Sequence, residues 1–258
     1  MTQIFLETAH PIAFDSPDHL YPLGTAHDNS VNPRFNEKLL NVMGVRYFSE
    51  ISLLDLGCSG GGFVQSWIDK GGLAVGVEGS DFSKKRGRAA WATLTDKYLF
   101  TADITQPFFV RNRESVDQVV KFDVITSWEV FEHLKEEELS QAIKNILHHL
   151  KEEGMAILSI STAEEFHKGH SLHQCVRDEK WWVKKFEEFG LLRCKEIENY
   201  FNGIYIRGIH QNAPKSFNLA LRKTAPNRSF KLSRMERLLD RFHCSPWPMK
   251  IRQWLNLS

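Results

Sequence analysis

Short apolar runs alternate with helical patterns along most of this chain. Runs of strand length, rich in Leu, Val and Ile, predict buried strands, and the segments between them carry apolar residues every three or four positions, as helices do. The predicted strands cover residues 51–55, 73–78, 97–101, 122–127 and 154–161, and the predicted helices cover 33–44, 62–70, 82–94, 136–151 and 178–189. Strands separated by helices pair in parallel through right-handed crossovers, so the pattern predicts an α/β protein with a mostly parallel sheet.

Boundary signals support two of these helices. Asn32 and Pro33 suit an N-cap and a first helical position, and Gly154 lies just past the helix predicted at 136–151. Two last apolar runs, 192–199 and 203–210, predict an antiparallel strand pair that ends the alternation.

The two ends of the chain depart from this alternation. Residues 1–32 contain Pro11, Pro17, Pro22 and Gly24 among many polar residues, which predicts irregular structure. We therefore divide the chain into an N-terminal lid with the first helix (1–45), a central α/β domain (46–210) and a C-terminal appendage (211–258).

Charge is concentrated in the appendage. The whole chain has a net charge of +1, but residues 211–258 hold ten Lys and Arg against only Glu236 and Asp240, so this segment is +8 and the remainder −7. A basic appendage favours an anionic partner or docking on the acidic remainder. We expect a docked helix, with a peripheral membrane contact or an RNA contact as alternatives. The residues with helical spacing are Leu232, Met235, Leu239 and Phe242.

Composition favours a globular protein outside the membrane. A hydrophobic fraction of 42% and a mean hydropathy of −0.35 fit a sizeable core. No run approaches the roughly 18 apolar residues of a membrane helix, and the first residues do not resemble a signal peptide. The cysteines, Cys58, Cys175, Cys194 and Cys244, form no C-x-x-C pair. We therefore expect a cytoplasmic protein with reduced thiols and no transmembrane segment.

A glycine-rich turn follows the strand predicted at 51–55. Asp55 closes that strand, and the segment Gly57–Gly62 leads into a predicted helix. Strand, glycine turn and helix N-terminus in this order form a nucleotide-binding turn. The next strand ends in Glu78, where a carboxylate can accept hydrogen bonds from ribose hydroxyls. Dinucleotide enzymes and S-adenosylmethionine (SAM) enzymes share this geometry.

The residues of this turn resemble motif I of the class I SAM-dependent methyltransferases. That motif is usually D-x-G-x-G-x-G, and here it is D-L-G-C-S-G-G, with Ser59 in place of the middle glycine. Asp103, in Thr101–Ile104, lies where the family has an adenine-contacting acid, and Phe122–Ser127 resembles the family's fourth strand. The resemblance covers roughly residues 30–210.

The resemblance implies a Rossmann-like fold: a seven-strand, mostly parallel sheet with one antiparallel strand, flanked by helices. It implies SAM as the cofactor and residues 46–210 as the SAM-binding catalytic domain. Glu78 would hold the ribose, Asp103 the adenine, and the glycine turn would approach the methionine part. The expected cofactor-binding residues are Asp55, Gly57, Cys58, Ser59, Gly61, Glu78, Gly79, Asp103, Ile104, Ser127 and Trp128.

Carboxylates and imidazoles follow two of the predicted strands. Glu129, Glu132 and His133 come after residues 122–127, and on a helical turn they would share one face. A loop after 154–161 supplies His173, with His170 as the rival. This E-x-x-E-H segment with a later histidine resembles the magnesium site of the ubiquinone-biosynthesis O-methyltransferases and the small-RNA 3′-end 2′-O-methyltransferases. It implies a Mg²⁺ or Mn²⁺ site made by Glu129, Glu132, His133 and His173.

Without a metal, the same residues suit acid–base chemistry. His173 or His133 would act as general base, because imidazole titrates near neutral pH. Glu129 would face the SAM end of the pocket. The expected catalytic residues are therefore His173, His133 and Glu129.

These features predict methyl transfer from SAM to oxygen, on a sugar or glycan precursor or on another small metabolite. One alternative is an RNA 2′-O-methyltransferase, which the basic appendage favours, although no RNA-binding motif occurs. The other is a non-catalytic SAM-binding module, against which the intact acidic and imidazole residues argue. We expect a small-molecule or glycan acceptor rather than a nucleic acid.

Overall fold

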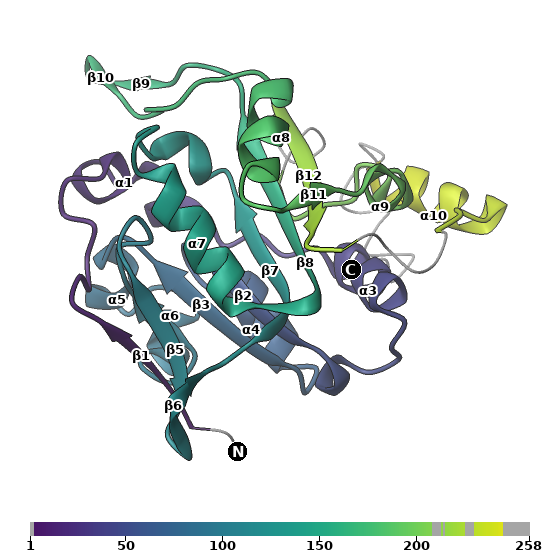
Figure 1. Ribbon diagram of the computed structural model, residues 1–258, viewed down its shortest axis with the longest axis horizontal. Coiled ribbons are helices and arrows are strands. Elements are labelled where there is room, and N and C mark those ends of the chain that lie inside the picture. Colours follow the sequence, from purple (N-terminus) through teal and green to yellow (C-terminus); the bar gives the residue numbers. More distant parts are fainter. Residues whose placement is uncertain (1–2, 208–212, 214, 225–229, 245–258) are drawn as a thin grey trace, which may run out of the picture.

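The computed structural model describes residues 3–207, 213, 215–224 and 230–244, and its centre is a seven-stranded sheet (Figure 1). The strand order is β11 (Leu192–Arg193), β12 (Ser216–Arg222), β8 (Leu150–Ser161), β7 (Phe122–Trp128), β2 (Ser52–Leu56), β3 (Leu73–Glu78) and β4 (Leu99–Thr101). From β8 to β4 the strands are parallel, whereas β12 is antiparallel to both β8 and β11. This confirms the predicted α/β fold with a mostly parallel sheet.

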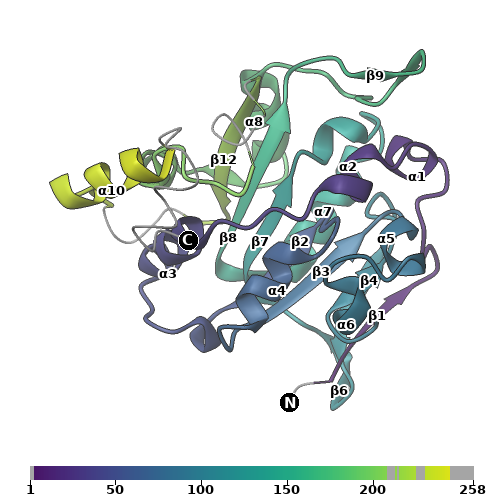
Figure 2. The same cartoon turned by 180° about the vertical axis from the view of Figure 1, so that it is seen from behind.

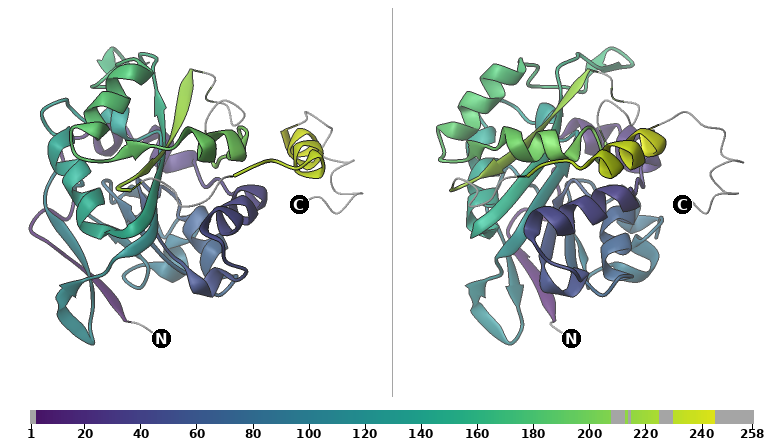
Figure 3. Two further views of the ribbon diagram at one scale, coloured as in Figure 1. Left: turned by 45° about the vertical axis from the view of Figure 1, so that its right-hand side comes forward. Right: turned by 90° about the vertical axis from the view of Figure 1, so that its right-hand side faces the viewer.

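Helices cover both faces of the sheet. In Figure 1, α7 (Leu139–His149) and α8 (Glu179–Glu187) lie in front of it. The view from behind in Figure 2 shows α4 (Gly62–Ile68), α6 (Trp91–Leu94) and α3 (Pro33–Met43) on the opposite face. In Figure 3, α10 (Arg234–Cys244) lies outside the sheet, near α3 and α9 (Lys195–Phe201).

Alternation along the strands divides the core into two layers. On β2, Leu54 and Leu56 belong to the layer under α7 and α8, whereas Leu53 belongs to the layer under α3 and α4. On β8, Leu158 belongs to the layer under α7 and α8, and its neighbour Ile157 belongs to the layer under α3 and α4. Successive side chains of a strand point to opposite faces, so apolar runs without polar interruption are what a sheet covered on both sides requires.

The N-terminal residues are more regular than predicted. β1 (Ile4–Thr8) pairs antiparallel with β5 (Phe108–Asn112), which pairs in turn with β6 (Ser115–Val119). Two short helices follow, α1 (Pro17–Leu20) and α2 (Leu23–His27). The prediction of irregular structure was wrong here because the strand partner lies far along the chain, where no local pattern reports it. The turn η1 (Phe48–Glu50) precedes β2.

The helix predicted at 82–94 is two short helices, α5 (Phe82–Lys85) and α6. Between them Gly87 and Ala89 have positive φ values of 55° and 49°, which end one helix before the other begins. The break presents Arg88 to the N-terminal segment, where its guanidinium donates to the backbone oxygens of Thr25 and Asp28. A tertiary contact therefore overrides the helical pattern.

The antiparallel strand pair predicted at 192–199 and 203–210 was wrong. Only Leu192–Arg193 is a strand; the following residues form α9, and no strand occurs in the described residues 203–207. Ile197, Tyr200 and Phe201 are buried at helical spacing. The strand that completes the sheet is β12, so the sheet extends beyond residue 210.

The remaining predictions concern the tail and the membrane. Helix α10 agrees with the helix expected in the appendage. The described part of the chain excludes the side chain of Phe242 and residues 211–212, 214, 225–229 and 245–258, so the prediction for these lies outside it. Within the described ranges, no helix is long and apolar enough to cross a membrane. Cys58, Cys175 and Cys194 are buried free thiols.

Candidate active site

A cavity of about 1060 Å³ opens at the carboxyl edge of the parallel strands. Residues from the ends of β2, β3, β4 and β7 line it, together with residues of the N-terminal segment and of the loop after β8. Ligands of open α/β sheets bind at this edge. Of the residues predicted at the site, the cavity is lined by Asp55, Gly57, Cys58, Ser59, Glu78, Gly79, Asp103, Ile104, Trp128, Glu129, His133 and His173, but not by Gly61, Ser127 or Glu132.

The glycine turn has a backbone that requires glycine. Gly57 has a φ of +77°, and a Cβ there would lie 2.3 Å from Cγ2 of Val130. A Cβ at Gly60 would meet Oδ1 of Asn29 at 2.5 Å. The turn therefore packs closely against both the segment after β7 and the N-terminal segment.

Polar contacts fix the N-terminal segment over this turn. Ser59 Oγ donates to the backbone oxygen of Asp28 at 2.9 Å, and Arg88 Nη2 donates to the oxygens of Thr25 and Asp28 at 2.7 Å each. Asp28 also pairs with Arg207, which follows α9. Arg88 was not predicted at the site, because it lies inside the segment 82–94 that was predicted as one continuous helix.

Two buried carboxyl groups lie beneath the turn. Glu78 is 4% exposed and accepts hydrogen bonds from the backbone N–H of Ser59 at 2.7 Å and from Thr25 Oγ1 at 3.3 Å. Burial, and then the charge of Asp18, raises the pKa of Glu78 to about 7. Burial likewise raises the pKa of Asp55 to about 7, although Thr126 Oγ1 donates to it at 2.6 Å.

Asp103 and Trp128 have partners of their own. Asp103 Oδ1 accepts from the N–H and the hydroxyl of Thr105, which orders the turn after β4. Trp128 packs edge to face against Phe35 and Phe63 while also lining the cavity. Trp128 therefore packs in the core and also forms part of the cavity wall.

A second group of polar residues, which we call the imidazole–carboxylate cluster, consists of Asp18, Glu132, His133, Glu165 and His173; all of these except Glu132 line the cavity. Atoms of Glu132, His133 and His173 that could bind a metal lie within 4.8 Å of one another. The rings of His133 and His173 meet edge to face with centroids 4.8 Å apart. The structure therefore brings together three of the four residues predicted as metal ligands.

Backbone contacts hold the loop of His173 against the turn η2 (Phe131–His133). The N–H groups of Gln174 and Cys175 both donate to the backbone oxygen of Glu132, at 2.7 and 3.0 Å. His173 Nδ1 donates to the backbone oxygen of Ala163, so Nε2 is the ring nitrogen that can accept a proton or bind a cation. Nε2 lies 3.3 Å from a carboxylate oxygen of Glu165.

The rival histidine lies elsewhere. His170 is in β10 (His170–Ser171), which pairs with β9 (Phe166–His167), and its ring stacks on Tyr21 at a centroid distance of 5.0 Å. It lines the cavity but is outside the metal-competent group.

Glu129 lies outside that group as well. Glu129 precedes η2, whose first residue is Phe131, and its φ of 55° is not helical. The arrangement expected for Glu129, Glu132 and His133, on one face of a helical turn, therefore does not form. Its Oε2 accepts from the hydroxyl of Ser216 on β12. Its charge still contributes to raising the pKa of Glu132.

Two members of the cluster, Asp18 and Glu165, were not predicted from the sequence. Asp18 comes from α1, and its Oδ2 lies 3.3 Å from His133 Nδ1. Burial raises the pKa of Asp18 to about 6 and lowers that of His133 to about 4, so His133 is neutral at pH 7. An acid in a segment predicted to be irregular carries no sequence signal that it faces a histidine more than 100 residues later.

The cluster contains buried polar atoms without hydrogen-bond partners in the described part of the chain. Oε2 of Glu132 is one of them, and Nδ1 of His133 makes no hydrogen bond either, although it lies 3.3 Å from Oδ2 of Asp18. Glu132 is fully buried; its Oε1 accepts from the N–H of Ser161 at 2.8 Å, and burial raises its pKa well above the ordinary value. Buried unpartnered donors and acceptors are costly, so a cation or a substrate group would satisfy them. One carboxyl group and two imidazoles form a donor set that fits a divalent transition metal ion.

The fold and this cavity define a class of protein: a Rossmann-like, class I SAM-dependent methyltransferase. A family model described as "Methyltransferase domain" matches residues 29–218. The match covers more than half of the chain, so the chain belongs to this methyltransferase family. The membership confirms the predicted family, whereas the roles of the individual site residues and the likeness of the E-x-x-E-H segment to a magnesium site stay predictions.

Similar proteins include a malonyl-[acyl-carrier protein] O-methyltransferase of Bacillus anthracis, which is 27% identical over 153 residues, or 58% of this chain and 53% of the relative. The chain thus spans about half the length of that curated relative. Among solved structures, the 1,6-didemethyltoxoflavin-N1-methyltransferase of Burkholderia thailandensis has a TM-score of 0.52 and 12% identity, covering 81% of this chain and 84% of that one. At this identity the likeness shows the fold alone.

Proposed function

We propose that this protein transfers the methyl group of SAM to a hydroxyl oxygen of a small molecule, with a sugar or glycan precursor as the first class to test. One observation carries the proposal. A single cavity joins the glycine turn, where SAM would bind, to the imidazole–carboxylate cluster, which could remove a hydroxyl proton. We also propose that residues 1–45 act as the lid, because His10, Phe14, Asp18 and Thr25 line this cavity.

The chain's own residues would perform three tasks. The glycine turn and Glu78 hold the cofactor, the cluster receives the acceptor hydroxyl, and the cavity walls align that oxygen with the methyl carbon. The oxygen attacks the methyl carbon as the carbon–sulfur bond breaks, which leaves S-adenosylhomocysteine. His173 Nε2, with its free lone pair, takes the hydroxyl proton. Alignment of the reacting atoms supplies much of the rate.

A divalent cation fits the same cluster. Glu132, His133 and His173 would hold it, and the observation that favours it is the buried Oε2 of Glu132, which has no hydrogen-bond partner in the described residues. When bound, such an ion lowers the pKa of a hydroxyl that contacts it. The carbonyl contact of His173 fixes its ring, as the partners of metal-bound histidines commonly do.

Metal binding is expected to be measurable in the protein saturated with S-adenosylhomocysteine. Titration calorimetry with Mn²⁺, and then with Mg²⁺, should show one ion per chain at pH 7.5. A Glu132→Gln, His133→Ala variant should show none, because two of the three ligands are lost.

A matched control is His170→Ala, which changes a histidine on the same loop but outside the metal-competent group. It should bind metal as the wild-type protein does. If no ion binds to the wild-type protein, proton removal by His173 alone is the mechanism to pursue. If the double variant binds as tightly as wild type, the ion is elsewhere.

Binding of the cofactor product should depend on pH through Glu78. Ribose hydroxyls donate hydrogen bonds to the ionised carboxylate of Glu78. Because the pKa of Glu78 is about 7, most of this carboxyl group is protonated at pH 6 and must lose its proton before it can accept these hydrogen bonds. The dissociation constant of S-adenosylhomocysteine should therefore rise about tenfold from pH 7.5 to pH 6. Calorimetry on Glu78→Gln should give weaker binding with a flatter pH profile. Since Asp55 has a similar pKa, an unchanged profile in Glu78→Gln would assign the titration to Asp55 instead.

The mouth of the cavity bears on the acceptor. Phe14 and Leu20 line it and are 60% and 58% exposed. An acceptor that carries an apolar part beside its reacting hydroxyl would cover these side chains and gain binding energy.

A further inference from the structure

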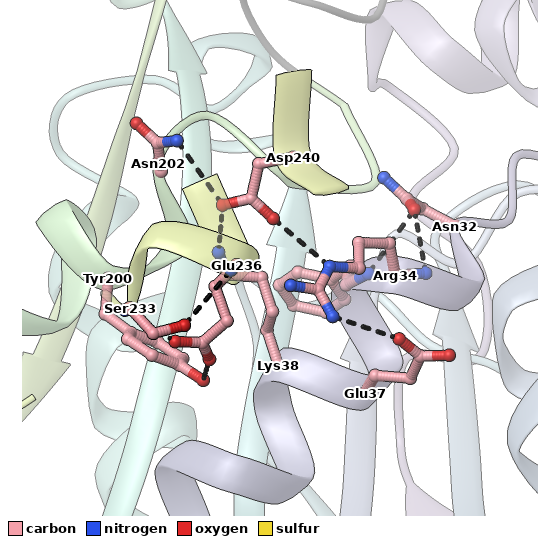
Figure 4. Close-up of polar contacts among 10 residues, drawn as sticks. Asn32, Arg34, Glu37, Lys38, Tyr200, Asn202, Ser233, Glu236 and Asp240 are labelled. Carbon is pink, nitrogen blue, oxygen red and sulfur yellow. Dashed lines mark hydrogen bonds and ion pairs between the residues drawn. The ribbon is translucent and has the colours of Figure 1, made fainter. Parts of the chain in front are cut away.

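Helix α10 is attached to the protein through a buried ion-pair network. Asp240 is 1% exposed and accepts from Lys38 Nζ at 2.5 Å and from Arg34 Nε at 3.1 Å, both on α3. It also accepts from Asn202 Nδ2 at 3.3 Å, at the end of α9 (Figure 4). This carboxylate therefore determines which side of α10 faces the protein.

The other acid of α10 lies on the same side. Glu236 accepts from the hydroxyl of Tyr200 on α9 at 2.8 Å and from the N–H of Ser233 at 2.8 Å (Figure 4). Ser233 Oγ in turn accepts from the N–H of Glu236, so the pair caps the first turn. Glu236 and Asp240 are the only acids in residues 211–258, and both are used in docking.

The outward side of α10 is apolar. Met235, Leu238 and Leu239 are 65%, 49% and 42% exposed. With about 3.6 residues per turn, these three positions fall within one third of the helix circumference, and Glu236 and Asp240 lie outside that arc, to one side of it. Exposed large apolar side chains that gather on one helix face mark an interaction surface.

Cations border this apolar face. Lys231 and Arg234 are exposed, and Arg234 lies between the apolar side and the docked side of the helix. The outward surface of α10 thus combines apolar side chains with positive charge and, in the described residues, carries no acid. A helix with these properties suits the boundary between lipid headgroups and acyl chains.

We infer that the outward face of α10 binds the surface of a membrane that contains anionic lipids. The apolar side chains enter the headgroup region and the cations pair with lipid phosphates. An RNA partner would satisfy the cations but leave Met235, Leu238 and Leu239 in water, so lipid is favoured over nucleic acid. The contact is peripheral and separate from the cavity, and it stands whether or not the proposed methyl acceptor is correct.

The test is co-sedimentation of the full chain with vesicles. Binding is expected to mixed phosphatidylglycerol–phosphatidylcholine vesicles and to be much weaker to pure phosphatidylcholine vesicles or at high salt. Leu238→Ser with Leu239→Ser should weaken binding about tenfold or more, because buried apolar area is lost. Lys231→Gln with Arg234→Gln should weaken it by a similar factor through the lost charge.

The matched control is Val116→Ser on β6, which alters an apolar side chain that is 52% exposed on another surface. It should bind vesicles as the wild-type protein does. S-adenosylhomocysteine binding should be unchanged in every variant, since none of the altered side chains lines the cavity. Thermal melting should change little, because all of the altered side chains are exposed.

Several outcomes would overturn the inference. These are failure to bind anionic vesicles, and vesicle binding that is unchanged by the two leucine substitutions. A dimer in sedimentation velocity that dissociates in the leucine variant would show that a second copy covers the face. Salt-sensitive binding to single-stranded RNA without vesicle binding would assign the cations to nucleic acid.

Discussion

A His173→Ala variant is expected to transfer methyl groups about 10²–10⁴ times more slowly than the wild-type protein. The substitution removes the Nε2 lone pair that the contact of Nδ1 with Ala163 leaves free. The same atom is lost whether it accepts the hydroxyl proton or binds a cation. The measurement is transfer of tritium from labelled SAM to the acceptor found by screening sugars and other hydroxylated small molecules.

Two comparisons make this result specific. His170→Ala removes a histidine from the same loop, where it stacks on Tyr21, and should transfer at a rate close to wild type. Binding of S-adenosylhomocysteine should be equal in both variants, because neither histidine belongs to the glycine turn. A His173→Ala variant with the wild-type rate would remove the cluster from the chemistry.

An Asp240→Ala variant is expected to lose about 3–5 kcal/mol of stability in the contact between α10 and α3. The substitution leaves Lys38, which is fully buried, without its counter-ion. Burial already lowers the pKa of Lys38, with Asp240 acting in the opposite direction. The free energy can be measured by hydrogen exchange, in which the amides of α10 should lose protection before the sheet does.

The network supplies matched controls for this prediction. Glu37→Ala removes the other partner of Arg34, a side chain that is 58% exposed, and should cost about 1 kcal/mol or less. Replacing both charges, as Lys38→Met with Asp240→Leu, should recover most of the loss, because a buried charge is no longer left unpaired. Unchanged protection of α10 in Asp240→Ala would contradict the assignment of this ion pair to docking.

Local sequence patterns predicted the parts of the fold with local causes. The buried strands β2, β3, β7 and β8 show as apolar runs, and α3 and α7 show as helical periodicity with recognisable ends. Asn32 caps α3 as expected, since its side chain accepts from the N–H groups of Arg34 and Phe35. The glycine turn was recognisable because its left-handed backbone restricts the choice of residue.

The errors arose where a distant partner decides the structure. β1 pairs with β5, about 100 residues later, and the helix α9 packs against β12 and α3. The break between α5 and α6 serves the contact of Arg88 with the N-terminal segment. A pattern within a short window contains no information about such partners.

The sequence by itself determined the class of this protein, because the glycine turn, the acidic strand ends and the alternation of strands and helices are local consequences of residue type. Only the tertiary structure decided the membership of the imidazole–carboxylate cluster. It brought Asp18 to His133 and Glu165 to His173, and turned Glu129 toward Ser216. It also decided that the two acids of α10 face inward and its apolar residues outward. Side-chain direction at these sites depends on contacts between segments far apart in sequence, which residue spacing does not encode.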